Sequence, residues 1–346
     1  MDKRIILAVA GSGKTTYIVN SLSLEKRSLL ITYTDNNYRN LKNKIIKRFG
    51  YFPENITLYR YFPFLYGFCY KPFLWMETRG RGINWEKPSF DRRFNSNNKR
   101  YYFDSCNRVY HNRMAKYLDN CGVLEQINQR LEKYFDNLFV DEIQDFAGHD
   151  FNFIESIARS NLNLLFVGDF FQHTFDTSRD GNVNKNLYED LQKFIIKLES
   201  MGLTVDRKTL QKSYRCSPTV CDFISKGLCI AVGSHRQEKT SIQFIDDQAE
   251  ADKIFKCNKT IKLFYQKHYT YECFSRNWGD SKGEDQYTDV CVVLNKTTYE
   301  KYQKNKLNEL KPQTRNKLYV ACSRARNNLY IVPEDLIKKC LCELTT

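Results

Sequence analysis

Apolar runs and amphipathic stretches alternate over the first fifty residues of the chain. Residues 5–9 and 28–34 are short, mainly apolar runs, which is typical of buried strands. A helical pattern follows each run, opening at 15–19 after the first and covering 35–49 after the second. Because strands and helices follow one another in turn, the pattern predicts a parallel α/β sheet.

The same alternation resumes later in the chain. We expect strands at 138–140 and 164–167 and a helix at 191–200, where the first domain ends. A second α/β unit follows, with strands expected at 241–244, 262–265, 290–294 and 329–332. The predicted fold class is α/β with parallel sheets in two domains, residues 1–200 and 201–346.

Residues 51–135 lose the alternation and are predicted to be an insertion in the first domain. Aromatic side chains gather there among cations, for example Tyr59, Tyr61, Phe62, Phe64, Tyr66, Trp75, Arg79, Arg81, Trp85, Lys87, Phe94, Lys99, Arg100 and Tyr101. Bases stack on aromatic rings and phosphates pair with cations, so this composition suits single-stranded nucleic acid. A loop-rich subdomain with a solvated basic face fits the same residues, and the sequence leaves both interpretations open.

The charge of the chain narrows the choice of partner. Lysine and arginine number 54 against 40 aspartate and glutamate, a net charge of +14, which favours a polyanion and above all nucleic acid. The twelve cysteines are scattered, which argues against a zinc site and favours a reducing, cytoplasmic compartment. No apolar stretch approaches a membrane span, so we expect no membrane partner.

A glycine-rich segment stands between the first predicted strand and helix. Residues 8–16 read A-V-A-G-S-G-K-T-T and fit the phosphate-binding pattern G-x-x-x-x-G-K-[ST], except that Ala8 replaces the first glycine. In such a loop the backbone amides wrap a triphosphate at a helix N-terminus. Lys14 is expected to reach the β- and γ-phosphates, and Thr15 to bind Mg²⁺. The candidate nucleotide-binding residues are Ala10, Gly11, Ser12, Gly13, Lys14, Thr15 and Thr16.

An apolar strand that ends in acids supplies the complementary chemistry. Residues 138–145 read L-F-V-D-E-I-Q-D. Asp141 is expected to orient Mg²⁺, and Glu142 to polarise the attacking water. An acidic exit from a strand is common in proteins, but downstream of a phosphate-binding loop it indicates nucleotide hydrolysis.

The wording and order of these motifs resemble superfamily 1 helicases of the UvrD/Rep type. The most specific matches are the A-x-A-G-S-G-K-T form of the loop and the D-E-x-Q-D form of the acidic motif. The resemblance implies two RecA-like P-loop NTPase domains, the first carrying residues 51–135 as an insertion similar to subdomain 1B. Further segments that match in the family's order are T-Y-T-D-N at 32–36, T-L-Y-R-Y-F at 57–62, V-G-D-F-F-Q-H-T-F at 167–175, L-Q-K-S-Y-R-C at 210–216, G-D-S-K-G-E-D at 279–285 and L-Y-V-A-C-S-R-A-R at 318–326.

The resemblance also implies roles for single residues. Gln172 would sense the γ-phosphate, while Arg215 and Arg324 would act as arginine fingers from the second domain. Tyr214 would stack on adenine, with Gly283 and Asp285 near the nucleotide. The residues implied to contact single-stranded DNA are Thr32, Tyr33, Thr34, Tyr59 and Phe175. The implied function is an ATP- and Mg²⁺-dependent DNA helicase or translocase whose hydrolysis depends on closure of the two domains.

Departures from the family leave other functions open. Few residues precede Ala8, so the family's adenine-reading segment is not expected in its usual place, and ATP is an expectation. The stretch between Arg215 and Lys282 is too short for the large insertion that the family uses on duplex DNA. The alternative is a nucleotide-gated DNA sensor that controls a partner such as a nuclease without unwinding. RNA suits the stacking residues as well as DNA does, whereas a metabolic kinase or a purely structural module does not explain the set of motifs.

Overall fold

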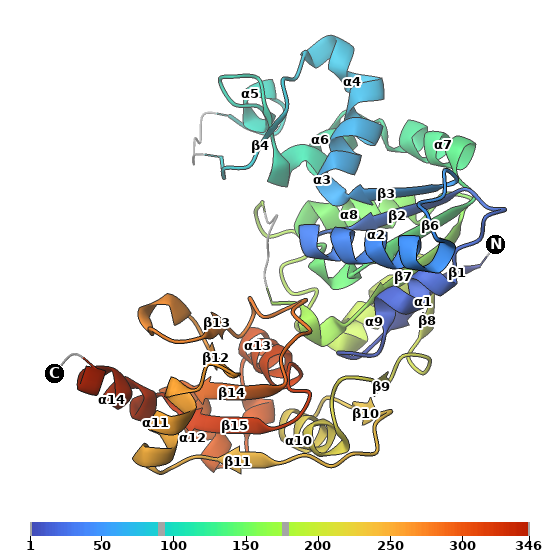
Figure 1. Ribbon diagram of the computed structural model, residues 1–346. Helices are drawn as coiled ribbons and strands as arrows, with labels where there is room; N and C mark the ends of the chain where they lie inside the picture. Colours follow the sequence, from blue (N-terminus) through green and yellow to red (C-terminus); the bar gives the residue numbers. More distant parts are fainter. Residues whose placement is uncertain (1, 89–93, 175–179, 345–346) are drawn as a thin grey trace. The chain divides into compact units, whose positions relative to one another are not determined.

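The chain forms two compact units in the computed structural model, which describes residues 2–88, 94–174 and 180–344 (Figure 1). Of these residues, unit 1 holds 2–6, 14–88, 94–168 and 180–206. Unit 2 holds 7–13, 169–174 and 207–344. Two short segments that we expected in the first domain, 7–13 and 169–174, therefore group with the second unit.

Unit 1 is built on a six-stranded sheet with the order β3-β2-β6-β7-β1-β8. The pairs β2–β3, β2–β6, β6–β7 and β1–β8 are parallel. β8 pairs with β1 and belongs to this sheet, so unit 1 extends past the boundary expected near residue 200. The strands are β1 (Lys3–Leu7), β2 (Ser28–Thr32), β3 (Ile56–Arg60), β6 (Asn137–Asp141), β7 (Asn163–Gly168) and β8 (Thr204–Asp206).

The first strand ends two residues earlier than the apolar pattern predicted. β1 stops at Leu7, and the next residues leave the sheet because the backbone N–H of Val9 donates to the carbonyl of Leu210, 3.0 Å away in unit 2. The apolar run at 5–9 is therefore divided between the end of β1 and the start of the glycine-rich loop.

Helices connect the strands of unit 1 in the expected alternation. The helix predicted at 35–49 is confirmed as α2 (Asp35–Phe49). Thr34 caps its start by accepting from the backbone N–H of Asn37 at 3.3 Å, and Gly50 ends it with a φ of +80°. The other helices of this alternation are α1 (Lys14–Asn20), α8 (Gly148–Ile157) and α9 (Leu191–Ser200).

The insertion is mainly helical and not loop-rich. Its aromatic residues form a core in which Tyr61, Phe64 and Tyr70 are fully buried. β3 lies within the predicted range of 51–135 but pairs with β2, so the insertion begins after Arg60. Its elements are α3 (Tyr61–Phe64), the π-helix η1 (Leu65–Tyr70), α4 (Lys71–Thr78), β4 (Ile83–Asn84), α5 (Lys99–Tyr102), β5 (Val109–Tyr110), the 3₁₀ turn η2 (His111–Arg113), α6 (Met114–Asn120) and α7 (Leu124–Tyr134).

Unit 2 contains a five-stranded parallel sheet with the order β11-β15-β14-β12-β13. Its strands are β11 (Ile242–Phe244), β12 (Thr260–Phe264), β13 (Ser275–Asn277), β14 (Asp289–Leu294) and β15 (Leu329–Pro333). A separate short parallel pair joins β9 (Lys212–Ser213) and β10 (Gly233–Ser234). The helices are α10 (Pro218–Leu228), α11 (Gln248–Lys256), α12 (Lys296–Gln303), α13 (Pro312–Cys322) and α14 (Glu334–Leu344).

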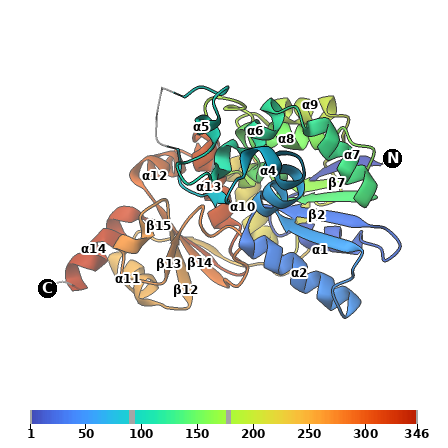
Figure 2. The same ribbon diagram turned by 90° about the horizontal axis from the view of Figure 1, so that it is seen from above.

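Both faces of this sheet are covered. Along β14, Val290, Val292 and Leu294 join one apolar cluster with α10 and α13, while Cys291 and Val293 join a second with α11 and α14. Figure 2 shows these helix pairs on opposite sides of the sheet. A strand buried on both faces reads as a continuous apolar run, as the sequence does here. The predicted α/β class with two RecA-like parallel-sheet units is confirmed.

Candidate functional site

In unit 1, the lysine of the phosphate-binding loop lies beside the acidic motif. Lys14 begins α1, and its Nζ is 3.5 Å from Oε1 of Glu142. The side-chain amide of Gln144 donates to the other carboxylate oxygen of Glu142. Glu142 follows β6 with a φ of +56°, a left-handed conformation that is uncommon for a non-glycine residue. The fold therefore brings together the lysine predicted to reach the phosphates and the acid predicted to polarise the attacking water.

Asp141 and Thr15 are the residues of unit 1 that would hold a divalent cation. Asp141 ends β6 and is buried; burial and the neighbouring Glu142 carboxylate raise its pKa to about 7, so a bound cation would stabilise its charged form. Hydroxyl and carboxylate oxygens suit Mg²⁺, which in nucleotide sites usually keeps waters and phosphate oxygens as its other ligands. Among the described residues no cluster of three or more His, Cys, Asp or Glu side chains could hold a metal.

The backbone of the glycine-rich loop is held within unit 2. Gly11 has a φ of +70°, and a Cβ there would lie 2.6 Å from Oγ of Ser213 and 2.8 Å from Cβ of Arg215, so only glycine fits. The carbonyl of Gly11 accepts from the backbone N–H of Tyr214 at 2.9 Å. The hydroxyl of Ser12 donates to the carbonyl of Val9 at 2.8 Å. The segment around 210–215 thus supports the curve of the loop.

Tyr319 of α13 connects the loop to the Gln172 motif. Its hydroxyl accepts from the backbone N–H of Ala10 at 2.8 Å and donates to Oδ2 of Asp169 at 2.9 Å. The side-chain amide of Gln172 donates to the same Oδ2 at 2.9 Å. Burial and the Asp169 charge raise the pKa of Tyr319, which keeps the hydroxyl protonated. The amide of Ala10, expected at the phosphate, is thus bonded to Tyr319, whose role sequence reasoning missed.

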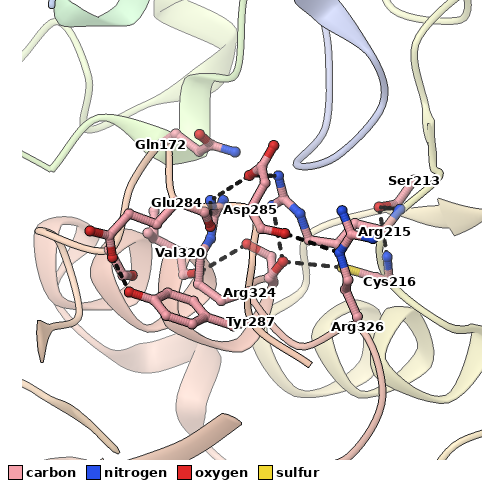
Figure 3. Close-up of polar contacts among 12 residues, drawn as sticks. Gln172, Ser213, Arg215, Cys216, Glu284, Asp285, Tyr287, Val320, Arg324 and Arg326 are labelled. Atoms are coloured by element: carbon pink, nitrogen blue, oxygen red, sulfur yellow. Dashed lines mark hydrogen bonds and ion pairs between the residues drawn. The ribbon is translucent and has the colours of Figure 1, made fainter. Parts of the chain in front are cut away.

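The two predicted arginine fingers share one carboxylate in unit 2 (Figure 3). Arg215 Nη2 donates to Oδ1 of Asp285, and Arg324 Nη1 lies 3.4 Å from the same oxygen. Burial and the charge of Arg215 lower the pKa of Arg324 to about 10, which leaves it charged at neutral pH. The side chain of Asp285 is 56% exposed, so it neutralises the buried guanidinium groups from the solvent side.

Tyr214 lies beside the loop and presents its ring to solvent. The residue is 65% exposed, and its ring stacks on the imidazole of His235 at a centroid distance of 4.1 Å and an angle of 15°. A Cβ on Gly13 would lie 3.7 Å from the Tyr214 ring, an ordinary contact. Sequence reasoning missed His235, since no motif marks it. Gly283, the other predicted nucleotide contact in this unit, adopts a φ of +82° in the turn before Glu284.

The residues expected to contact nucleic acid have different surroundings. Tyr33 follows β2 and is partly exposed, Thr34 is exposed and caps α2, and Tyr59 on β3 is partly exposed. Thr32 is fully buried, so its side chain does not reach the surface. Phe175 lies outside the described residues. In the nucleotide loop, the hydroxyl of the remaining candidate, Thr16, accepts from Lys44 Nζ at 2.9 Å.

Within the described chain, no helix has both the length and the apolar character needed to cross a lipid bilayer.

Comparison with known proteins gives a family but no close relative. No curated protein matches the chain. Among solved structures, the arterivirus nonstructural protein 10 helicase in complex with DNA is similar at 16% identity and a TM-score of 0.48. The similarity covers 95% of this chain and 60% of that one, so the chain spans about three fifths of that protein's length. The model of the viral superfamily 1 RNA helicase core domain matches residues 103–333, more than half of the sequence. The chain therefore belongs to the viral superfamily 1 helicase core family.

Proposed function

We propose that this chain is an ATP-hydrolysing helicase or translocase that moves on single-stranded nucleic acid. The observation that carries the proposal is the contact of Lys14 with Glu142, which joins a phosphate-binding lysine to an acid able to orient water. Membership of the helicase family supports the same reading. The similarity of the motif sequences to the UvrD/Rep type remains a resemblance, because the matching family model is that of viral helicases.

Hydrolysis is proposed to follow from positioning and charge rather than from covalent chemistry. Lys14 pairs with the β- and γ-phosphates, and Glu142, held by Gln144, accepts a proton from the attacking water. Mg²⁺ held by Thr15 and Asp141 would neutralise charge on the phosphates. Because Glu142 contacts Lys14, binding of a triphosphate to Lys14 would replace that partner and release the carboxylate for water.

Unit 2 is proposed to supply the remaining cations and the base contact. Arg215 and Arg324 would stabilise the charge that builds up on the transferred phosphoryl group. Tyr214, backed by His235, would stack on the base with its open face. The proposal requires Lys14 and the two arginines to reach the same triphosphate, so hydrolysis would depend on the approach of the two units.

The second part of the proposal concerns whether the nucleic acid is DNA or RNA. The family description favours RNA, while the UvrD/Rep-type wording of the motifs favours single-stranded DNA. We propose single-stranded nucleic acid as the shared substrate class, since aromatic rings stack on the bases of either polymer.

ATP hydrolysis by the purified chain tests the proposal, measured alone and with single-stranded DNA, duplex DNA or RNA at stated salt. We expect stimulation by a single strand and a loss of at least about 100-fold in Lys14→Ala and Glu142→Gln. The matched control is Glu155→Gln, which removes a different acid of unit 1 that pairs with Lys197 at 2.6 Å. Hydrolysis that survives both substitutions contradicts the assigned site.

A second candidate is the nucleotide-gated sensor, favoured by the compact unit 2. Between α10 and the turn at 279–283, the described chain holds only β10–β13, α11 and short turns, with no added domain that could grip a duplex. A strand-displacement assay separates the two functions. ATP hydrolysis that a single strand stimulates, without displacement, would favour the sensor.

A further inference from the structure

Two pairs of parallel strands in unit 1 end in aromatic residues that lie side by side. β2 and β3 are aligned with Thr32 opposite Arg60, so the next residues, Tyr33 and Tyr61, are neighbours, with their rings stacked at 5.7 Å. In the insertion, β4 and β5 are aligned with Asn84 opposite Tyr110. The residues that follow them, Trp85 and His111, stack at 5.8 Å and 29°. Strand register thus explains both contacts.

Phe62 joins the two pairs into one aromatic cluster. Its ring lies edge-to-face with Tyr33 at 5.5 Å, with Trp85 at 5.3 Å and with His111 at 5.4 Å. Phe62 and His111 are buried, whereas Tyr33 is partly exposed and Trp85 is 60% exposed. The cluster therefore has a buried centre and reaches solvent at Tyr33 and at Trp85, which are separated by a single side chain.

The exposure of Trp85 differs from that of the other tryptophans. Trp278 is fully buried in unit 2. Trp75 is 38% exposed, but its indole N–H donates to the carbonyl of Gly80 at 3.1 Å, and Arg79 lies over its ring at 5.2 Å. These contacts give the Trp75 side chain a structural role. Trp85 is held through ring contacts to Phe62 and His111 while most of its surface remains in water, as a stacking platform requires.

We propose that Trp85 is a base-stacking residue for single-stranded nucleic acid, extending the path that begins at Tyr33 into the insertion. The inference deepens the proposed function and depends on it for the role of Tyr33. The charge near Trp85 along the chain suits phosphates, since Arg79, Arg81 and Lys87 are exposed within residues 79–87, and Glu86 is the exposed acid within that range. The net charge of +14 favours the same occupant.

Fluorescence tests the proposal directly, because the chain has three tryptophans. In Trp75→Phe protein the emission comes from Trp85 and the buried Trp278. We expect twelve-residue oligo(dT) or oligo(U) to quench this emission saturably without nucleotide, and the quenching to vanish when Trp85→Phe is added. Absence of quenching while anisotropy shows the oligonucleotide bound would overturn the proposal.

Affinity gives a second readout with a matched control. We expect Trp85→Ala to raise the Kd for the oligonucleotide by about tenfold, Trp85→Phe to restore most of the affinity, and Trp75→Ala to change it less than about twofold. Thermal melting identifies variants that fail to fold. If Trp85→Ala fails to fold, the Kd of Trp85→Phe tests the proposal in its place. An unchanged Kd in folded Trp85→Ala refutes the inference.

The two proposals fail in distinguishable ways. If a single strand stimulates ATP hydrolysis but Trp85→Ala binds it normally, only the role of Trp85 is wrong. If Trp85 is quenched while the chain hydrolyses no ATP, the motor function is wrong and the stacking residue stands. If the aromatic surface binds a protein segment and no oligonucleotide, Trp85 does not have the role proposed.

Discussion

At the scale of single residues, Asp285 is the carboxylate that neutralises the buried Arg215 and Arg324 of unit 2. Its carboxylate accepts from Arg215 and lies 3.4 Å from Arg324, and both guanidinium groups are otherwise bonded to neutral partners such as the carbonyls of Ser323 and Val320. The two cations would repel each other without it. Asp285 therefore orients both predicted fingers.

Replacing Asp285 with Asn keeps an oxygen acceptor but removes the charge. We expect Asp285→Asn to lower the free energy of unfolding by about 1 kcal/mol, since the carboxylate is half exposed while the arginines are buried. Chemical denaturation measures the change. The matched control is Glu238→Gln, which neutralises an exposed acid 2.5 Å from Arg236 in the same unit and should alter stability by less than about 0.5 kcal/mol. Equal losses in the two variants would refute the assigned charge balance.

Sequence reasoning reached the residues that motifs mark and missed those that tertiary contacts recruit. Lys14, Glu142, Arg215 and Arg324 could be named as candidates because local spacing carries their signal. Tyr319 is one residue of the motif at 318–326, but its bonds to Ala10 and Asp169 join positions far apart in the chain, which no local pattern predicts. His235 lies in no motif and is recruited because β10 pairs with β9 beside Tyr214.

At the scale of elements, regular alternation made the parallel sheets predictable and the insertion unpredictable. The helices at 35–49 and 191–200 are confirmed to the residue, and the four strands expected in unit 2 are confirmed to within two residues, whereas β9, β10 and β13 were not expected. The helices of the insertion pack aromatic side chains on several sides, which hides the usual period of apolar residues. The π-helix at Leu65–Tyr70 adds a further break in that period.

Two glycines of unit 1, one after a helix and one within a helix, test how backbone conformation affects stability. Gly50 ends α2 with a φ of +80°, so Gly50→Ala should lower the free energy of unfolding by about 1 kcal/mol although no atom lies within 4 Å of the new Cβ. Gly67, exposed in the π-helix and with equally open space, has no positive φ. Gly67→Ala should raise stability by about 0.5 kcal/mol. Thermal unfolding of both variants measures the difference, and shifts of the same sign would contradict it.

At the scale of the whole molecule, the excess of positive charge predicts how strongly salt weakens binding. A protein that contacts about four phosphates of a single strand should bind roughly 50-fold more weakly at 200 mM than at 50 mM salt. Titration of oligo(dT) and oligo(U) at several salt concentrations gives the slope. A slope near zero would mean that the net charge of +14 does not contribute to binding of the oligonucleotide.

The grouping of residues 7–13 with unit 2 has a consequence for anyone who dissects this protein into fragments. A polypeptide truncated after Asp206 would keep the glycine-rich loop but lose Ser213, Tyr214 and Arg215, against which Gly11 is fitted. The remaining half would carry an unsupported loop, and the complementary half would lack it. The proposed nucleotide site is therefore not a module that a gene fusion or a domain swap could transplant with one half of the chain.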